Sequence, residues 1–303
     1  MLVSDRTPIR MLLRIDGIPI VLFTLFSIAI YCLHHYAHIK VDVPLSVVGT
    51  LGTAVAILLG FKNNTAYDRW WEARKIWGGV VNQSRYLGSQ LVVYMDKNKE
   101  VDSEAHSQLL HELVRRHLAY IDLLRLQLRE QPTDEPIEKW LGETDAAKLS
   151  VARNKATQIL TIQSNRFQEL YEDKQIEQFR LFELMNTVRR FFELQGKAER
   201  IKNTPLLKHY SQFTTAFVWV FVLLLPLGFI GGMDWKMIPL SIIVSTIFTM
   251  LDRAGTYTEN PFANNFNDVA LTAICRTIEI DMLQQIGVNE VPDGIVANDG
   301  ILM

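Results

Sequence analysis

Four long uncharged blocks, arranged as two pairs around a charged middle region, constrain this chain more than any other feature. They cover residues 17–33, 43–61, 209–233 and 237–251. A helix that spans a bilayer needs about 20 mainly apolar residues, within a range of about 17–25. The first three blocks meet this length, and packing against neighbouring helices can complete the shorter fourth. The sequence therefore predicts an integral membrane protein with four spans.

Basic residues near the ends of these spans predict the orientation of the chain. They gather before the first span, after the second, before the third and after the fourth, whereas the connector at residues 34–42 holds only Lys40. Because cytoplasmic loops carry the excess of Lys and Arg, both termini and the middle region are expected in the cytoplasm. The residues concerned are Arg6, Arg10, Arg14, Lys62, Arg69, Arg74, Lys75, Arg200, Lys202, Lys208 and Arg253.

The charged middle region is predicted to be a helical domain. Apolar residues recur there at spacings of three and four, the pattern of an amphipathic helix. Further helices are expected over about 143–172 and about 174–196, the latter ended by Gly196 or by Thr204-Pro205. No strand-like alternation stands out, so the predicted fold class is all-α. The amphipathic positions are Leu110, Val114, Leu118, Ile121, Leu124 and Leu128.

These patterns divide the chain into four parts. Residues 1–72 hold the N-terminus and spans one and two, and residues 73–204 form the cytoplasmic helical domain. Residues 205–252 hold spans three and four. Residues 253–303 form a cytoplasmic C-terminal segment that begins with turns, continues into a helix around Ile278 and ends in a loosely ordered tail from Val288.

Composition and motifs exclude several classes of function. A formal net charge of −2 argues against a nucleic-acid binder that neutralises phosphates. The two cysteines, Cys32 and Cys275, exclude a disulfide framework and a Cys-only zinc site, and Cys32, inside an apolar block, is expected to be buried. The sequence holds no phosphate-binding Walker loop, nucleophile elbow, zinc-protease motif or dinucleotide fingerprint. We therefore expect neither an enzyme nor a bound cofactor.

Histidines at the outer end of the first span are the best metal candidates. His34 and His38 lie one helical turn apart, which would place both imidazoles on one face. No carboxylate or cysteine stands close by, so polar interface residues are the favoured interpretation and a structural metal site is the alternative.

The second span carries two parallel stripes. Gly52, Ala56 and Gly60 form a ridge of small residues that lets another helix approach closely. Thr53, Ile57 and Phe61 form a stripe of larger side chains one residue further on. From spacing alone, packing against helices or lipid is the favoured interpretation of both. If several copies surrounded an axis, stacked apolar rings would instead form a constriction that gates by excluding water.

Four sequence stretches resemble the bestrophin family, in its prokaryotic branch. They are GFKNNTAYDRWWEARKIWG (60–78), KAERIKNTPLLKHY (197–210), ENPFANNFNDVAL (259–271) and AICRTIEIDMLQQ (273–285), in the family's order and with its four-span layout. The signature residues are Asp68, Arg69, Trp70, Trp71, Glu72, Asn260, Pro261 and Phe262.

This resemblance implies a mostly helical homopentameric ion channel with one axial pore. Its hydrophobic neck falls on the stripe of Thr53, Ile57 and Phe61. Thr53 stands where the family has an aliphatic residue, so the outer ring of the neck is expected to be wetter or wider. The family's second, cytoplasmic constriction maps near residues 176–181, where Ile176, Phe179 and Arg180 are the candidates and Phe179 is preferred.

Animal members of the bestrophin family carry a run of acidic residues after the Asn-Pro-Phe motif, and these residues bind calcium. The chain departs most from the family in this stretch. Here that stretch holds Asn264, Asn265 and Asn267 with a single carboxylate, Asp268. Calcium prefers six to eight oxygen ligands, and its affinity rises with their charge. We therefore expect no high-affinity calcium gating.

The function implied is a passive channel for monovalent ions in a bacterial inner membrane. The resemblance favours chloride-type anions, while cations such as sodium are open in this branch. The alternatives are a secondary transporter and a membrane-anchored scaffold or enzyme. The expected partners are four further copies of the chain, the lipid bilayer and the permeant ions, with no nucleic acid.

Overall fold

The structure, a computed structural model, describes residues 9–38, 43–95, 103–205, 208–298 and 300–302. The regular structure of these residues consists of α-helices, one short 3₁₀ turn and an isolated bridge between Asn298 and Ile301, with no strand. The predicted all-α fold class is confirmed.

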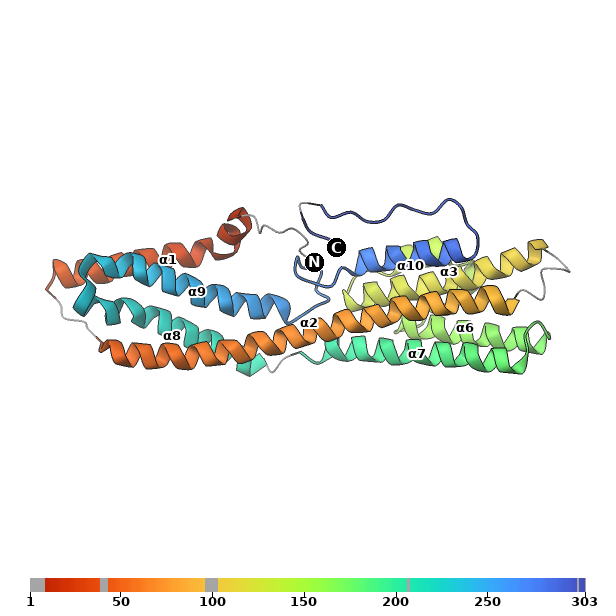
Figure 1. Cartoon of the computed structure of the whole chain (residues 1–303), viewed down its shortest axis with the longest axis horizontal. Coiled ribbons are helices and arrows are strands. Elements are labelled where there is room, and N and C mark those ends of the chain that lie inside the picture. The colour runs from red at the N-terminus through yellow and green to blue at the C-terminus, as the bar shows by residue number, and fades with distance from the viewer. Residues whose placement is uncertain (1–8, 39–42, 96–102, 206–207, 299, 303) are drawn as a thin grey trace. The chain divides into compact units, whose positions relative to one another are not determined.

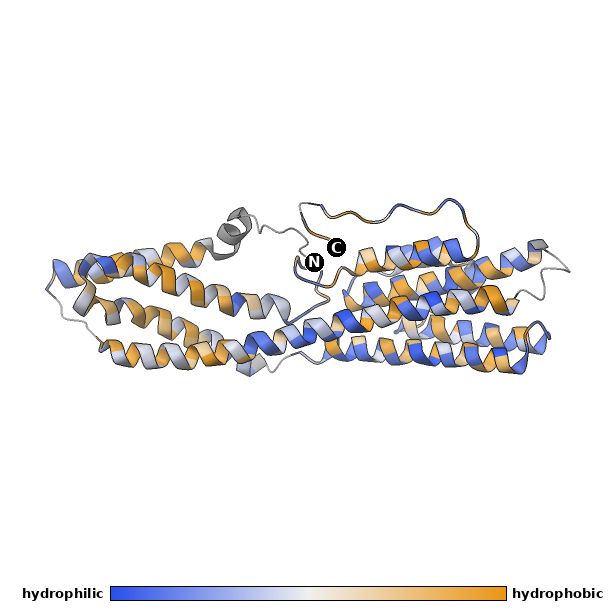
Figure 2. Cartoon of the chain, viewed as in Figure 1, coloured by the Kyte–Doolittle hydropathy of each residue, from blue (hydrophilic) through white to orange (hydrophobic). Residues whose placement is uncertain are grey.

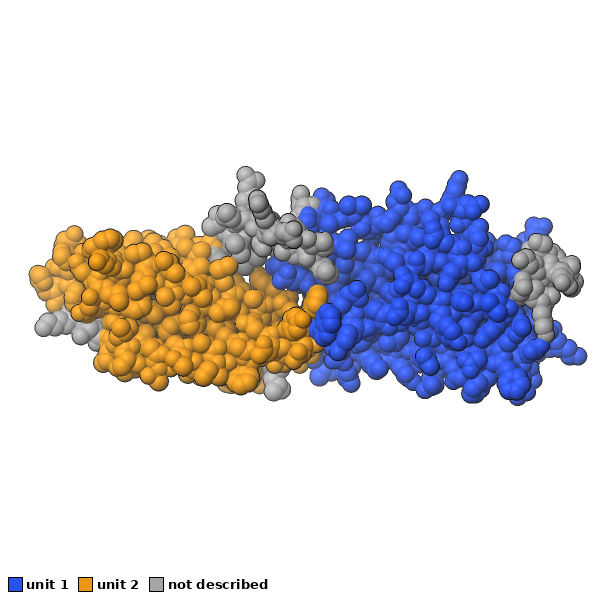
Figure 3. Space-filling model, in the orientation of Figure 1, with its two compact units in different colours: residues 1–3, 71–204, 261–303 blue, residues 4–70, 205–260 orange. Residues whose placement is uncertain are grey.

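Two compact units make up the chain (Figure 3). The unit that we call apolar contains the described parts of residues 4–70 and 205–260, and the unit that we call charged contains those of residues 71–204 and 261–303. Hydrophobic residues predominate along the helices of the apolar unit, whereas hydrophilic and hydrophobic residues alternate along those of the charged unit (Figure 2). Helix α2 (Leu45–Met95) contributes its first part to the apolar unit and its second part to the charged unit.

The apolar unit consists of α1 (Ile9–His35), the first part of α2, α8 (Lys208–Met233) and α9 (Met237–Thr258). A 3₁₀ turn at Asp234–Lys236 joins α8 to α9, which then run antiparallel and side by side (Figure 1). Three apolar segments are long enough to cross a membrane: Gly17–His35, one within α2, and His209–Thr258. The third includes both α8 and α9, so predicted spans three and four form one apolar segment folded at the turn.

Apolar side chains from three helices form the core of this unit. Phe23 of α1, Val55 of α2 and Phe221 of α8 are all buried in it. At Gly52, a Cβ atom would lie only 2.7 Å from the ring of Phe221, so α2 and α8 approach each other at a residue that has no side chain. The ring of Phe221 also packs against that of Phe248 on α9, with 4.6 Å between centroids.

The charged unit combines the second part of α2 with six further helices. These are α3 (Ser103–Leu128), α4 (Asp134–Trp140), α5 (Glu143–Ser150), α6 (Lys155–Glu172), α7 (Gln178–Asn203) and α10 (Leu271–Gln285). All six apolar positions predicted for the amphipathic helix lie in α3 and are buried. That prediction is confirmed.

One prediction of a continuous helix was wrong. The helix expected over residues 143–172 is two helices, α5 and α6, with a break at residues 151–154. The side chain of Asn154 accepts a hydrogen bond from the backbone N–H of Thr157 at 2.9 Å, so it caps the start of α6. The next helix, α7, continues past Gly196 and ends at Asn203, before Thr204-Pro205.

Candidate functional site

Within the apolar unit, helix α2 has two opposite faces. Val55, Leu59 and Lys62 are among the residues that pack its buried face. With 3.6 residues per turn, Ile57 and Phe61 lie on the other side, where 55% of the Ile57 side chain and 63% of the Phe61 side chain are exposed. Thr53, one turn before Ile57, is exposed on the same side. The predicted stripe therefore lies on the surface of the single chain and takes no part in its core.

The hydroxyl of Thr53 is already used within the helix. It donates to the backbone carbonyl oxygen of Gly49 at 3.0 Å, as Thr50 does to Ser46 at 2.9 Å. This bond consumes the only hydroxyl proton of Thr53 and leaves its methyl group and oxygen lone pairs to face outward.

The small residues Gly52, Ala56 and Gly60 do not all lie on the same face of α2. Gly52 lies against Phe221, whereas Ala56 is exposed. At Gly60, a Cβ atom would meet no described atom within 4 Å, apart from the helix's own backbone. Close packing within the chain therefore occurs at Gly52, while Ala56 and Gly60 lie beside the exposed stripe.

A buried ionic cluster holds the end of the apolar part of α2 against α9. The Lys62 side chain is fully buried, and its Nζ atom lies 2.7 Å from Asp252 Oδ1 and 2.9 Å from Thr256 Oγ1. Thr215 of α8 donates to both oxygens of the same carboxylate, at 2.9 and 3.2 Å. Charges buried in this way must be paired and hydrogen-bonded, and this pair is.

Helices α2 and α9 also approach each other closely beside that cluster. A Cβ atom at Gly255 would lie 2.5 Å from Asn63 Oδ1 and 3.3 Å from Lys62 Cγ. A side chain at Gly255 would therefore displace the side chain of Asn63 and crowd that of Lys62. Neither Lys62 nor Asp252 was predicted as a site residue; their only sequence signal was a pair of opposite charges just after two apolar blocks.

The signature after this cluster combines anchored and exposed residues. The Nε atom of Arg69 donates to the backbone oxygen of Glu259 at 3.1 Å, which ties α2 to the end of α9. Trp70 stacks on Tyr67 at 6.4 Å between ring centroids, and Asp68 is exposed.

In the charged unit, Glu72 pairs with Arg200 at 2.8 Å, Trp71 is exposed, and Pro261 and Phe262 are buried. Asn260, the last residue of the apolar unit, is exposed.

The asparagine-rich loop before α10 does not have the composition of a tight calcium site. Asp268 accepts a hydrogen bond from the backbone N–H of Asn265 at 2.9 Å, and burial raises the pKa of its carboxyl group. Its Oδ1 atom and Oδ1 of Asn264 are buried and have no hydrogen-bond partner in the described structure. One carboxylate and amide oxygens supply too little negative charge for a tight divalent site.

The three candidates for a cytoplasmic constriction are in different environments. Ile176 is buried, and Arg180 donates from Nη1 to the backbone oxygen of Tyr94 at 2.7 Å. Phe179 is 84% exposed and, with neighbouring Phe182, lines a hollow of about 670 Å³ on α7. Of the three, Phe179 has the side chain that is available for contacts outside the chain.

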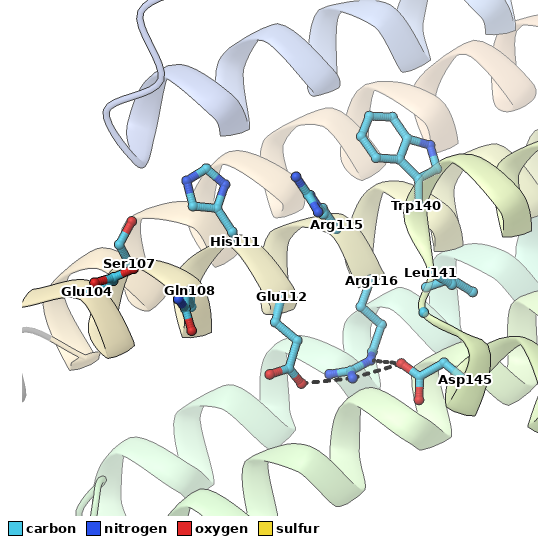
Figure 4. A pocket seen from close by; sticks show the side chains of 11 residues that line it. Glu104, Ser107, Gln108, His111, Glu112, Arg115, Arg116, Trp140, Leu141 and Asp145 are labelled. Carbon is cyan, nitrogen blue, oxygen red and sulfur yellow. Dashed lines mark hydrogen bonds and ion pairs between the residues drawn. The ribbon is translucent and has the colours of Figure 1, made fainter.

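A second cavity, of about 580 Å³, lies beside α3 in the charged unit (Figure 4). Its central guanidinium, that of Arg116, is bonded to Asp145 at 2.8 Å and to Glu112 at 2.9 Å. Figure 4 shows His111 and Arg115 on the opposite side of the helix from these groups. The central guanidinium of this cavity is therefore held by two carboxylates of the chain itself.

The histidines at the outer end of the first span lie at and just after the end of α1. The ring of His35 stacks on that of Tyr31, with 5.4 Å between centroids, and meets the ring of Tyr36 edge-on, with 4.9 Å between centroids. Across the described residues, no three His, Cys, Asp or Glu side chains are grouped closely enough to hold a metal ion.

Comparisons with known proteins assign the chain to a family. The sequence model for the Bacterial/Fungal Bestrophin protein family matches residues 11–284. The chain belongs to the bestrophin family. The resemblance identified from the four sequence stretches is thereby confirmed.

Curated relatives and solved structures agree with this assignment. The "voltage-dependent anion channel-forming protein YneE" of Escherichia coli K12 is 30% identical over 273 residues, covering 90% of this chain and 87% of YneE. The similarly named protein sll1024 of Synechocystis is 29% identical, covering 80% and 78% of the two chains. A bacterial bestrophin homolog from Klebsiella pneumoniae has a TM-score of 0.80 at 26% identity, covering 89% and 98%. This bestrophin is therefore an ion-channel protein and not an enzyme.

Proposed function

We propose that five copies of this bestrophin assemble around one axial pore, that α2 of each copy lines it, and that monovalent ions pass through. Rings of Thr53, Ile57 and Phe61 form the neck. The observation that carries the proposal is the exposure of Ile57 and Phe61 on a helix whose opposite face is fixed in the core. Apolar rings of this kind gate conduction by excluding water.

The residues beside the stripe favour contact with other copies over contact with lipid. Gly49, Ala56 and Gly60 are exposed along one flank of the stripe, and no other described side chain fills the space at Gly49 or Gly60. Small residues let helix backbones approach closely, which is the usual feature of helix–helix contacts in membranes.

The proposed placement has four spans, formed by α1, the first part of α2, α8 and α9. It follows from the apolar segments and from basic residues at their ends, and it puts both termini on the cytoplasmic side of a bacterial inner membrane. The charged unit is then cytoplasmic. Exposed Phe179 on α7 is the proposed second constriction within it.

The test is single-channel recording in planar bilayers. Replacing Ile57 and Phe61 together with alanine should raise the single-channel conductance several-fold, because the wider neck stays wet. Phe213→Ala is a matched control: Phe213 lies on α8 of the same unit and is 61% exposed, close to the value for Phe61. Unchanged currents in the double variant, or an equal change in Phe213→Ala, would show that the stripe is not the neck.

A further inference from the structure

The exposed stripe of α2 changes from apolar to acidic within the apolar unit. After Phe61, Asn64 and then Asp68 occupy the same side of the helix at spacings of three and four, and both are exposed. Asp68 lies seven residues after Phe61, which corresponds to about 10 Å along the helix axis. Its carboxylate forms no hydrogen bond or ion pair with another described residue.

The other two charged residues of α2 in the apolar unit are engaged elsewhere. Arg69, the adjacent residue, donates to the backbone oxygen of Glu259. Lys62 is buried with Asp252, on the opposite side of the helix from the stripe. Among the described charged residues of α2 in the apolar unit, Asp68 is thus the one whose charge is exposed on the stripe.

We infer that Asp68 is a specificity-determining residue that favours cations over anions on the cytoplasmic side of the neck. The inference rests on the proposed function, because only a ring of copies would bring five such carboxylates around one opening. The neck itself carries no charge, so the preference for one sign of ion must come from charged positions beside it. Rings of Asp or Glu are the usual device by which channels attract cations.

The electrostatic effect of the Asp68 carboxylates reaches ions close to the mouth of the neck. At physiological ionic strength an exposed charge acts over about 8 Å, so a ring at this position influences ions that enter or leave the neck and few others. Five equal charges act on the same ion, and they change the local concentrations of cations and anions in opposite directions. Neutralising all five should therefore change the ratio of permeabilities more than the total current.

The test is the reversal potential in planar bilayers under an asymmetric KCl gradient. Relative to the wild type, Asp68→Asn should lower the ratio of potassium to chloride permeability by about fivefold or more, since it removes the whole ring of charge. Asp68→Ser, a second neutral variant, should do the same, and Asp68→Glu should keep the wild-type ratio. Asp68 is exposed, so these variants should fold and assemble normally.

Glu259→Gln is the matched control. It removes one carboxylate from the same unit, at the end of α9 and away from the stripe, and it should leave the ratio unchanged. An unchanged ratio in Asp68→Asn and Asp68→Ser, or an equal shift in Glu259→Gln, would overturn the inference while wild-type currents leave the proposed function standing. A wild-type protein that passes no current would overturn both.

Discussion

A buried histidine links pH to the stability of the charged unit. His117 on α3 is 2% exposed, its Nε2 atom lies 2.9 Å from the hydroxyl of Ser84, and its ring packs 4.7 Å from that of Phe191. Burial lowers the pKa of His117 to about 3, against about 6.5 in an unfolded chain. Between these values the unfolded state binds a proton that the folded state does not, so stability falls as pH falls.

The burial of His117 predicts how the stability of the detergent-solubilised protein changes between pH 7 and pH 5. The wild type should lose about 2 kcal/mol from His117 over this interval, at roughly 1.4 kcal/mol per unit below pH 6.5. His117→Leu should remove this part of the pH dependence, and His111→Leu, at a partly exposed position on the same helix, should retain it. Denaturation monitored by tryptophan fluorescence at each pH measures it, and equal slopes in the wild type and His117→Leu would contradict it.

At the scale of helices, the Lys62 cluster holds α2 in a fixed rotation against α8 and α9. Removing one member of a buried pair leaves a charge without its partner and costs about 3–5 kcal/mol, whereas replacing both members by apolar groups costs much less. Lys62→Met should therefore destabilise the protein strongly, and the double variant Lys62→Met with Asp252→Leu should recover much of the loss. Lys236→Met, at an exposed lysine in the turn after α8, should change stability by less than about 0.5 kcal/mol.

Thermal denaturation of the wild type, the single variants Lys62→Met and Asp252→Leu, and the double variant in detergent forms a double-mutant cycle. A double variant as unstable as the sum of its single substitutions would show that the two charges do not interact. Because Phe61 precedes Lys62 directly, loss of the pair should also alter the conductance of the channel.

The sequence predicted helices well where apolar residues recurred at helical spacing without interruption. The stripe of α3 is an example, since each of its apolar positions is buried. The break between α5 and α6 was missed because residues 151–154 hold neither proline nor glycine, and its signal is the single cap residue Asn154. Cys32 was expected to be buried and is exposed in the single chain. A uniformly apolar segment does not show which of its side chains face the core and which are exposed.

Contacts between distant parts of the chain were beyond local patterns. The pairing of Lys62 with Asp252 joins residues 190 positions apart, and two charges at the ends of apolar blocks are as compatible with solvent as with each other. The exposure of Ile57 and Phe61 likewise depends on which face of α2 the other helices cover. Spacing identified the stripe, and only the packing of α8 and α9 on the opposite face showed that it lies free in one chain.

At the scale of the whole molecule, the proposal requires copies of α2 to meet along the flank that contains Ala56 and Gly60. A Cβ atom at Gly60 would contact no other described side chain, while one at Gly52 would meet the ring of Phe221. The same substitution at these two glycines should therefore have different consequences. One position tests assembly, and the other tests the packing of the single chain.

Gly60→Leu should leave each chain folded but prevent close approach of neighbouring α2 helices. The wild-type particle in detergent should have a protein mass of five times the 34.8 kDa chain, and the variant should give smaller particles with unchanged helical content. Gly52→Leu should instead lower the thermal stability of the chain itself, since Phe221 must move. Light scattering with detergent correction measures the mass, and circular dichroism measures helical content and stability. A pentameric Gly60→Leu particle, or a wild type of any other mass, would contradict this arrangement of α2 around the pore.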